Sequence, residues 1–101
     1  MKVMTICGSM RFSLEMKRIA FELESFRGYN VLQCTYNKFN QEITPPMREN
    51  LERAHFEKID QSDGIYVVDI GGYIGNSVRR EIAYARSRGK EILLHSEAPI
   101  I

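Results

Sequence analysis

Short apolar runs alternate along the chain with longer stretches in which apolar residues recur at helical spacing. The runs lie at Val3–Cys7, Val31–Thr35, Ile65–Val68 and Ile92–Leu94, and each has the length of a β-strand. Ile65–Val68 is apolar without interruption, which is typical of a central parallel strand covered on both faces. The pattern therefore predicts four strands.

Three amphipathic stretches separate the predicted strands. The apolar residues of the first stretch are Phe12, Met16, Ile19, Leu23 and Phe26. Gly28 follows them, as expected just past the end of a helix. The second helix is predicted from the proline pair at Pro45, which suits a first helical turn, to about Asp60. The third is predicted from about 77 to 88 and ends at Gly89.

The resulting β-α-β-α-β-α-β order predicts an α/β fold: one domain over residues 1–101, built as a three-layer sandwich. We expect a four-stranded parallel sheet with strand order 2-1-3-4 and right-handed crossovers, flavodoxin-like or Rossmann-like. Such sheets bind ligands at the carboxyl ends of their strands. The strand ends near Gly8, Thr35, Asp69 and His95 should therefore share one edge of the sheet.

Composition and charge limit the partners. The 101 residues are 44% hydrophobic and 27% charged, with a formal net charge of +1, which disfavours nucleic acid and anionic membranes as partners. No apolar run approaches the ~20 residues of a membrane span, and Met1–Met10 lacks the features of a secretion signal. We expect a cytoplasmic protein in which Cys7 and Cys34 are buried free thiols. Their spacing, and that of His55 and His95, predicts no metal site.

The turn after the first predicted strand reads Gly8-Ser9-Met10-Arg11. Backbone N–H groups at the start of a helix bind anions, Ser9 adds a hydroxyl, and Arg11 could pair with phosphate oxygens. Alone, the segment modestly favours an ordinary turn that has a serine cap and a surface arginine.

Glu81 follows a second unusual turn, the glycine-rich segment 71–75. At ~100° per residue, Glu81 lies at the border of the buried stripe of its helix and on the same side as Ser77. An early helical position favours the ionised carboxylate that a nucleophile requires. The alternative is a surface glutamate paired near Arg88. The glycines, which allow a ligand to approach the backbone, favour the functional interpretation.

Two segments carry a resemblance to a known family. ICGSMR at 6–11 and VVDIGGYIGNSVRREIAYARSRGKEI at 67–92 resemble the two motifs of the nucleoside 2-deoxyribosyltransferase superfamily. The likeness is greatest to its deoxynucleoside 5′-monophosphate N-glycosidase branch. The resemblance implies a nucleotide-type substrate, no cofactor, and cleavage or transfer at the N-glycosidic bond.

The resemblance also implies roles for individual residues. Glu81 would be the nucleophile on C1′ and form a glycosyl-enzyme intermediate, as in retaining glycosidases. Asp69 would contact the sugar or help the base to leave. The residues implied to hold the substrate and its 5′-phosphate are Gly8, Ser9, Arg11, Gly75, Asn76 and Ser77.

Other interpretations stay open. The segment GGYIGNSVRRE also resembles the glycine-rich loop of the cytokinin-activating phosphoribohydrolases. A non-catalytic nucleotide-binding module is favoured by Thr5 and His55, which stand where the family carries tyrosine and aspartate. His55 is in that case a half-buried packing residue rather than an accessory site residue.

A self-associating scaffold is favoured by apolar Tyr73 and Ile74 and by the tail at 99–101. All these interpretations suit a homodimer or a higher homo-oligomer, because so small a sheet buries limited area.

Overall fold

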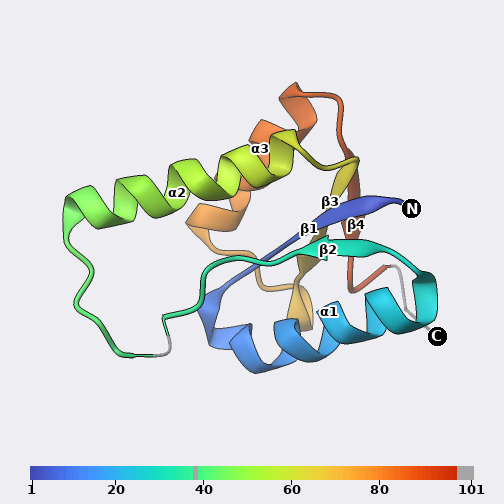
Figure 1. Cartoon of the computed structure of the whole chain (residues 1–101), viewed down its shortest axis with the longest axis horizontal. Helices are drawn as coiled ribbons and strands as arrows, with labels where there is room; N and C mark the ends of the chain where they lie inside the picture. Colours follow the sequence, from blue (N-terminus) through green and yellow to red (C-terminus); the bar gives the residue numbers. More distant parts are fainter. Residues whose placement is uncertain (38, 98–101) are drawn as a thin grey trace.

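The sheet has four parallel strands in the order β2-β1-β3-β4 (Figure 1). It is seen in a computed structural model that describes residues 1–37 and 39–97. The strands are β1 (Val3–Gly8), β2 (Asn30–Leu32), β3 (Gly64–Val68) and β4 (Glu91–Leu94). The predicted α/β fold and strand order are confirmed.

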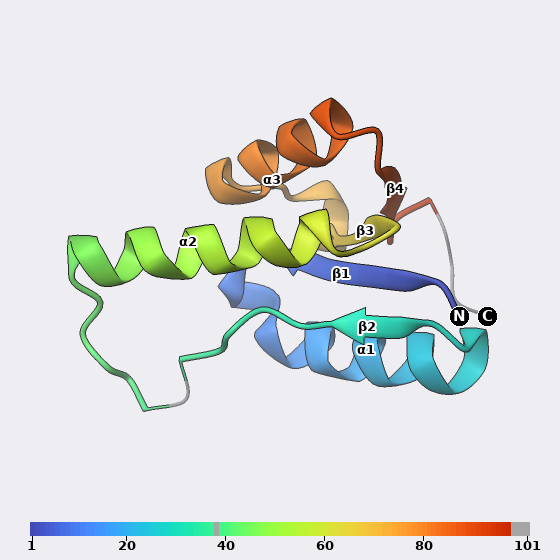
Figure 2. The ribbon, with the colours of Figure 1, turned by 45° about the horizontal axis from the view of Figure 1, so that its top comes forward.

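Three helices cover the sheet, as the periodicity predicts. They are α1 (Ser13–Arg27), α2 (Pro45–Asp60) and α3 (Asn76–Ser87). Two single turns of 3₁₀-helix, η1 (Met10–Phe12) and η2 (Ile70–Gly72), lie after β1 and β3. Figure 2 shows α1 on one side of the sheet and α2 and α3 on the other, which completes the three layers.

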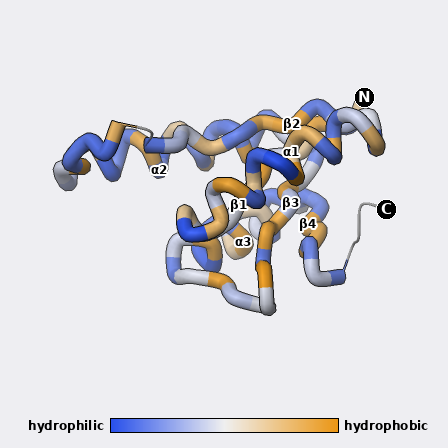
Figure 3. The backbone as a smooth tube through the Cα atoms, turned by 90° about the horizontal axis from the view of Figure 1, so that it is seen from below, coloured by the Kyte–Doolittle hydropathy of each residue, from blue (hydrophilic) through white to orange (hydrophobic). Residues whose placement is uncertain are grey.

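Each face of the sheet has its own buried core. Successive strand residues point to opposite faces, so Met4 and Ile6 of β1 pack with α1, whereas Cys7 packs with α2 and α3. All five residues of β3 are buried, as expected for a strand covered on both sides. In Figure 3 the tube through β3 is largely hydrophobic, whereas α2 alternates between hydrophilic and hydrophobic residues.

Two details differ from the sequence-based prediction. Strand β2 ends at Leu32 rather than at Thr35, because its ladder with β1 ends at the pair Thr5 and Leu32. Phe26, predicted on the apolar stripe of α1, is 59% exposed. It lies about 80° from Met16 around the helix, and Ala20 is buried in the core instead.

Three further expectations concern surfaces and the chain end. Within residues 1–37 and 39–97, no helix combines the length and the apolar character that crossing a bilayer requires. Tyr73 is 40% exposed, whereas the apolar tail at 99–101 lies outside the described residues. The homo-oligomer stays a prediction.

Gly64 is required by the close approach of β4. A Cβ atom at this position would lie 2.5 Å from the backbone oxygen of Glu91 and 2.8 Å from its Cβ. Gly64→Ala should therefore force β4 away from β3 and lower the free energy of unfolding by about 1–3 kcal/mol, the usual range for overpacking. Urea unfolding measures the change. Gly75→Ala is the control, because its added Cβ would meet only the Tyr73 side chain, whose nearest atom is 3.4 Å away; equal losses in both variants would contradict this account.

Candidate functional site

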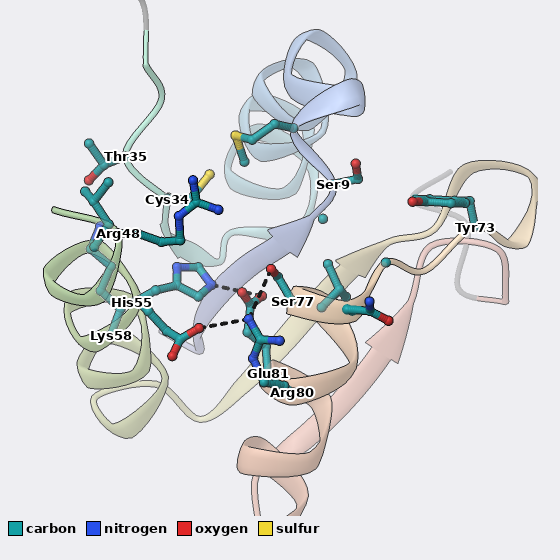
Figure 4. A pocket seen from close by; sticks show the side chains of 17 residues that line it. Ser9, Cys34, Thr35, Arg48, His55, Lys58, Tyr73, Ser77, Arg80 and Glu81 are labelled. Atoms are coloured by element: carbon teal, nitrogen blue, oxygen red, sulfur yellow. Dashed lines mark hydrogen bonds and ion pairs between the residues drawn. The ribbon is translucent and has the colours of Figure 1, made fainter. Parts of the chain in front are cut away.

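A cavity of about 490 Å³ lies at the carboxyl end of β1, between α2 and the start of α3. Figure 4 shows side chains from both helices pointing into it. The predicted site residues that line the cavity are Gly8, Ser9, His55, Gly75, Asn76, Ser77 and Glu81. Two turns far apart in sequence thus meet in one space, as the strand topology predicts.

Glu81 lies in the cavity wall with 16% of its side chain exposed. Val78 and Ala85 anchor α3 against the sheet, which leaves Glu81 directed sideways toward α2 (Figure 4). Its Oε1 atom lies 3.3 Å from Nε2 of His55. The carboxylate is therefore held in one position, yet it remains open to a ligand.

His55 of α2 is buried, and its side chain lies between Glu81 of α3 and Cys7 of β1. Its Nε2 atom lies 3.4 Å from Sγ of Cys7, and its Nδ1 atom has no hydrogen-bond partner within the described ranges. Burial raises the pKa of the Cys7 thiol well above its ordinary value, and the charge of Glu81 raises this pKa further. The thiol is consequently protonated at neutral pH. Both cysteines are free, as predicted, although Cys34 is only partly buried and lines the cavity.

Asp69 lies outside the cavity. Its side chain is buried, and its two carboxylate oxygens accept hydrogen bonds from the backbone N–H and the hydroxyl of Ser96, at 2.9 and 2.7 Å. Ser96 follows the neighbouring strand β4, so the carboxylate fixes the turn at the end of that strand. The geometry supports a structural role for Asp69 in place of the substrate contact that the resemblance implies.

Arg11 also lies outside the cavity. Its guanidinium carbon is 3.8 Å from the ring centre of Tyr73, the distance of a cation–π contact. Ser9, by contrast, lines the cavity and caps η1 by accepting a hydrogen bond from the backbone N–H of Arg11 at 3.3 Å. The turn is built as predicted, but its arginine points elsewhere.

Three cations that the sequence interpretation missed line the cavity. Arg48 and Lys58 come from α2, and Arg80 comes from α3. Figure 4 shows Arg48 reaching over the ring of His55. Lys58 donates to the backbone oxygen of Gln33 at 2.8 Å. A signal was present in the sequence: residues 48, 52, 55 and 58 are three or four apart, so they form a polar stripe on one face of α2.

The start of α3 is open to an anion. Its N-cap is Gly75, which offers no side chain to the free backbone N–H groups, and its first turn contains no acidic residue. Gly75, Asn76 and Ser77 all line the cavity. Unpaired N–H groups and the helix dipole both favour negative charge at such a place.

Arg80 adds positive charge beside this turn. Its guanidinium lies 3.4 Å from Oγ of Ser77 and forms an ion pair with Glu52 at 3.0 Å. The cavity thus combines a nearly buried carboxylate with a helix start and cations that suit an anionic ligand.

No family model matches this chain, and the searches of curated proteins and of solved structures likewise return no match.

Proposed function

We propose that this protein cleaves the N-glycosidic bond of nucleoside 5′-monophosphates, by hydrolysis or by transfer to another base, with Glu81 as the nucleophile. The observation that carries the proposal is the position of Glu81, a nearly buried carboxylate in a cavity of about 490 Å³ beside an uncapped helix start. A carboxylate that is shielded from water and held by a neighbour is suited to attack a sugar carbon.

In the proposed reaction, an oxygen of Glu81 attacks C1′ while the bond between C1′ and the base nitrogen breaks. The base leaves with the bonding electron pair and takes up a proton from solvent. Water then attacks C1′, which releases the Glu81 carboxylate and gives the sugar 5-phosphate. If a second base attacks in place of water, the reaction is a transfer.

The phosphate is proposed to bind at the N-terminus of α3, with Ser9 on the opposite side. Arg48 is the cation that we assign to the substrate. Its guanidinium reaches into the cavity, and it has no ion-pair partner within residues 1–37 and 39–97, whereas Arg80 is paired with Glu52. In this proposal Arg48 takes the part that the sequence resemblance gives to Arg11.

The experiment that tests the function is incubation of the purified protein with a panel of ribo- and deoxyribonucleoside 5′-monophosphates. Free base is measured by chromatography, with EDTA present so that trace metal ions do not interfere. Release of base from the deoxy series supports an N-glycosidase of the first family that the sequence resembles. Release from the ribo series alone supports the phosphoribohydrolase alternative.

Arg48→Ala should raise the KM for a nucleoside 5′-monophosphate by about 10- to 100-fold, because a charged hydrogen bond contributes about 1.5–3 kcal/mol. The KM for the uncharged nucleoside should change little. Arg11→Ala is the matched control, since Arg11 does not itself line the cavity and contacts only the ring of the lining residue Tyr73; its KM should stay within about twofold. A large increase in KM for Arg11→Ala, with no change for Arg48→Ala, would contradict this proposal. It would instead support phosphate binding by Arg11, as the sequence resemblance implies.

A second candidate is nucleotide binding without turnover, and Thr5 favours it. The Thr5 side chain is fully buried and bonds to the Ser62 hydroxyl and to the backbone oxygen of Lys58 at 3.1 Å. Thr5 therefore offers nothing to a substrate at the position where the resembling family carries tyrosine. A nucleotide that raises the Tm, with no release of base, would support this candidate.

A further inference from the structure

Three side chains with different metal-binding groups meet beside the cavity, and two of them, His55 and Glu81, line it. They are the Cys7 thiol from β1, the His55 imidazole from α2 and the Glu81 carboxylate from α3. Their ligand atoms all lie within 4.8 Å of one another. Sequence spacing could not reveal this cluster, because the positions 7, 55 and 81 are brought together only by the parallel topology.

The separations between these atoms match the spacing around a tetrahedral zinc ion. With metal–ligand distances of about 2.0–2.3 Å, neighbouring ligand atoms are about 3.3–3.6 Å apart. Cys7 Sγ lies 3.4 Å from His55 Nε2, and His55 Nε2 lies 3.3 Å from Glu81 Oε1. Two of the three separations between ligand atoms therefore lie in the range that a tetrahedral zinc ion requires.

The charge, ligand atoms and burial of these three side chains indicate which metal ions could bind between them. A thiolate and a carboxylate together neutralise a divalent cation, which reduces the cost of burying it. A sulfur and an imidazole ligand favour zinc-like ions over Mg²⁺ and Ca²⁺, which prefer oxygen ligands. Cys7 is 1% exposed, whereas His55 and Glu81 line the cavity. A metal bound between them would thus have a path of entry.

We propose that Cys7, His55 and Glu81 bind one Zn²⁺ ion, with the fourth coordination position directed to the cavity. Sγ of Cys7 releases its proton to solvent as the metal–sulfur bond forms, while His55 binds as neutral imidazole through Nε2 and Glu81 binds as carboxylate. Three protein ligands with an open fourth position are the arrangement of accessible zinc sites in proteins.

One consequence rests on the proposed function. A Glu81 carboxylate bound to zinc cannot attack C1′, so Zn²⁺ should inhibit the release of base and EDTA should restore it. The metal site itself does not depend on that activity, and it is therefore tested without any nucleotide.

The test is titration of the reduced, metal-free protein with Co²⁺, followed by displacement with Zn²⁺. We expect one equivalent to bind and to produce a thiolate-to-cobalt charge-transfer band in the near ultraviolet. The chain has only two cysteines, so a band that persists in Cys34→Ala identifies Cys7 as the ligand even if a Cys7 variant does not fold.

His55→Ala and Glu81→Gln should each weaken Zn²⁺ binding by at least about tenfold, since loss of even an outer-shell partner has this effect. Circular dichroism and the Tm verify that these variants are folded. The proposal is overturned if the folded wild-type protein gives no charge-transfer band, if the band disappears in Cys34→Ala, or if both ligand variants bind Zn²⁺ as tightly as the wild type. None of these outcomes involves nucleotide cleavage, so failure here is distinguishable from failure of the proposed function.

Discussion

Glu81→Gln is expected to lower kcat for base release by at least about 1,000-fold, equivalent to roughly 4 kcal/mol of transition-state stabilisation. The amide has nearly the size of the carboxylate but is a poor nucleophile toward C1′, so the covalent step is lost. Binding of the nucleotide should be retained, because the proposed phosphate contacts come from Ser9, Arg48 and the start of α3. Steady-state kinetics and the nucleotide-induced change in Tm measure the two effects separately.

The control for this variant is Glu49→Gln, which removes the same charge from an exposed position of α2 that does not line the cavity. Its kcat should stay within about twofold of the wild type. If Glu81→Gln and Glu49→Gln have the same kcat, Glu81 is not the nucleophile.

Leu23→Ala should lower the free energy of unfolding by about 2–5 kcal/mol, the range for truncation of a buried leucine. Leu23 is fully buried in the core between α1 and the sheet. A domain of this size has a total stability of only about 5–15 kcal/mol, so the variant loses a large share of it. Urea unfolding followed by circular dichroism gives the value.

Leu14→Ala is the matched control, with the same chemical change on the same helix. Leu14 is 76% exposed, so the monomer should lose no more than about 0.5 kcal/mol. If both variants lose a similar amount of unfolding free energy, α1 does not pack against the sheet through the face that contains Leu23.

Much of the fold could be predicted because the hydrophobic periodicity and the glycines are local signals in the sequence. The order of the elements that they define then limits the possible topology of the sheet. The uninterrupted run at Ile65–Val68 identified the central strand, and Gly28 and Gly89 marked the helix ends. Alternation of strands and helices then led to parallel order 2-1-3-4. From that order it followed that the turns after β1 and β3 meet at one edge, where the cavity lies.

The differences between the sequence-based site assignments and the observed contacts have a common physical origin, since they concern where side chains point after the backbone is fixed. Arg11 and Asp69 were assigned from their places at strand ends, but Arg11 contacts Tyr73 and Asp69 binds Ser96. Arg48 and Cys7 were missed for the converse reason. Arg48 lies on the polar stripe of α2, but spacing along one helix does not show what that stripe faces. The proximity of Cys7 to His55 has no signature in the spacing of residues.

The central claim, that Glu81 attacks C1′, is tested most directly by trapping the covalent intermediate. The metal-free protein is mixed with a nucleoside 5′-monophosphate that carries fluorine at C2′, because an electronegative substituent there disfavours the oxocarbenium-like transition state of hydrolysis. After rapid acid quenching, the intact mass is measured and the adduct is located by peptide sequencing. The account predicts a mass increase of one sugar phosphate, carried by Glu81 and absent from Glu81→Gln. Stoichiometric base release without an adduct, or with an adduct on another residue, would contradict it.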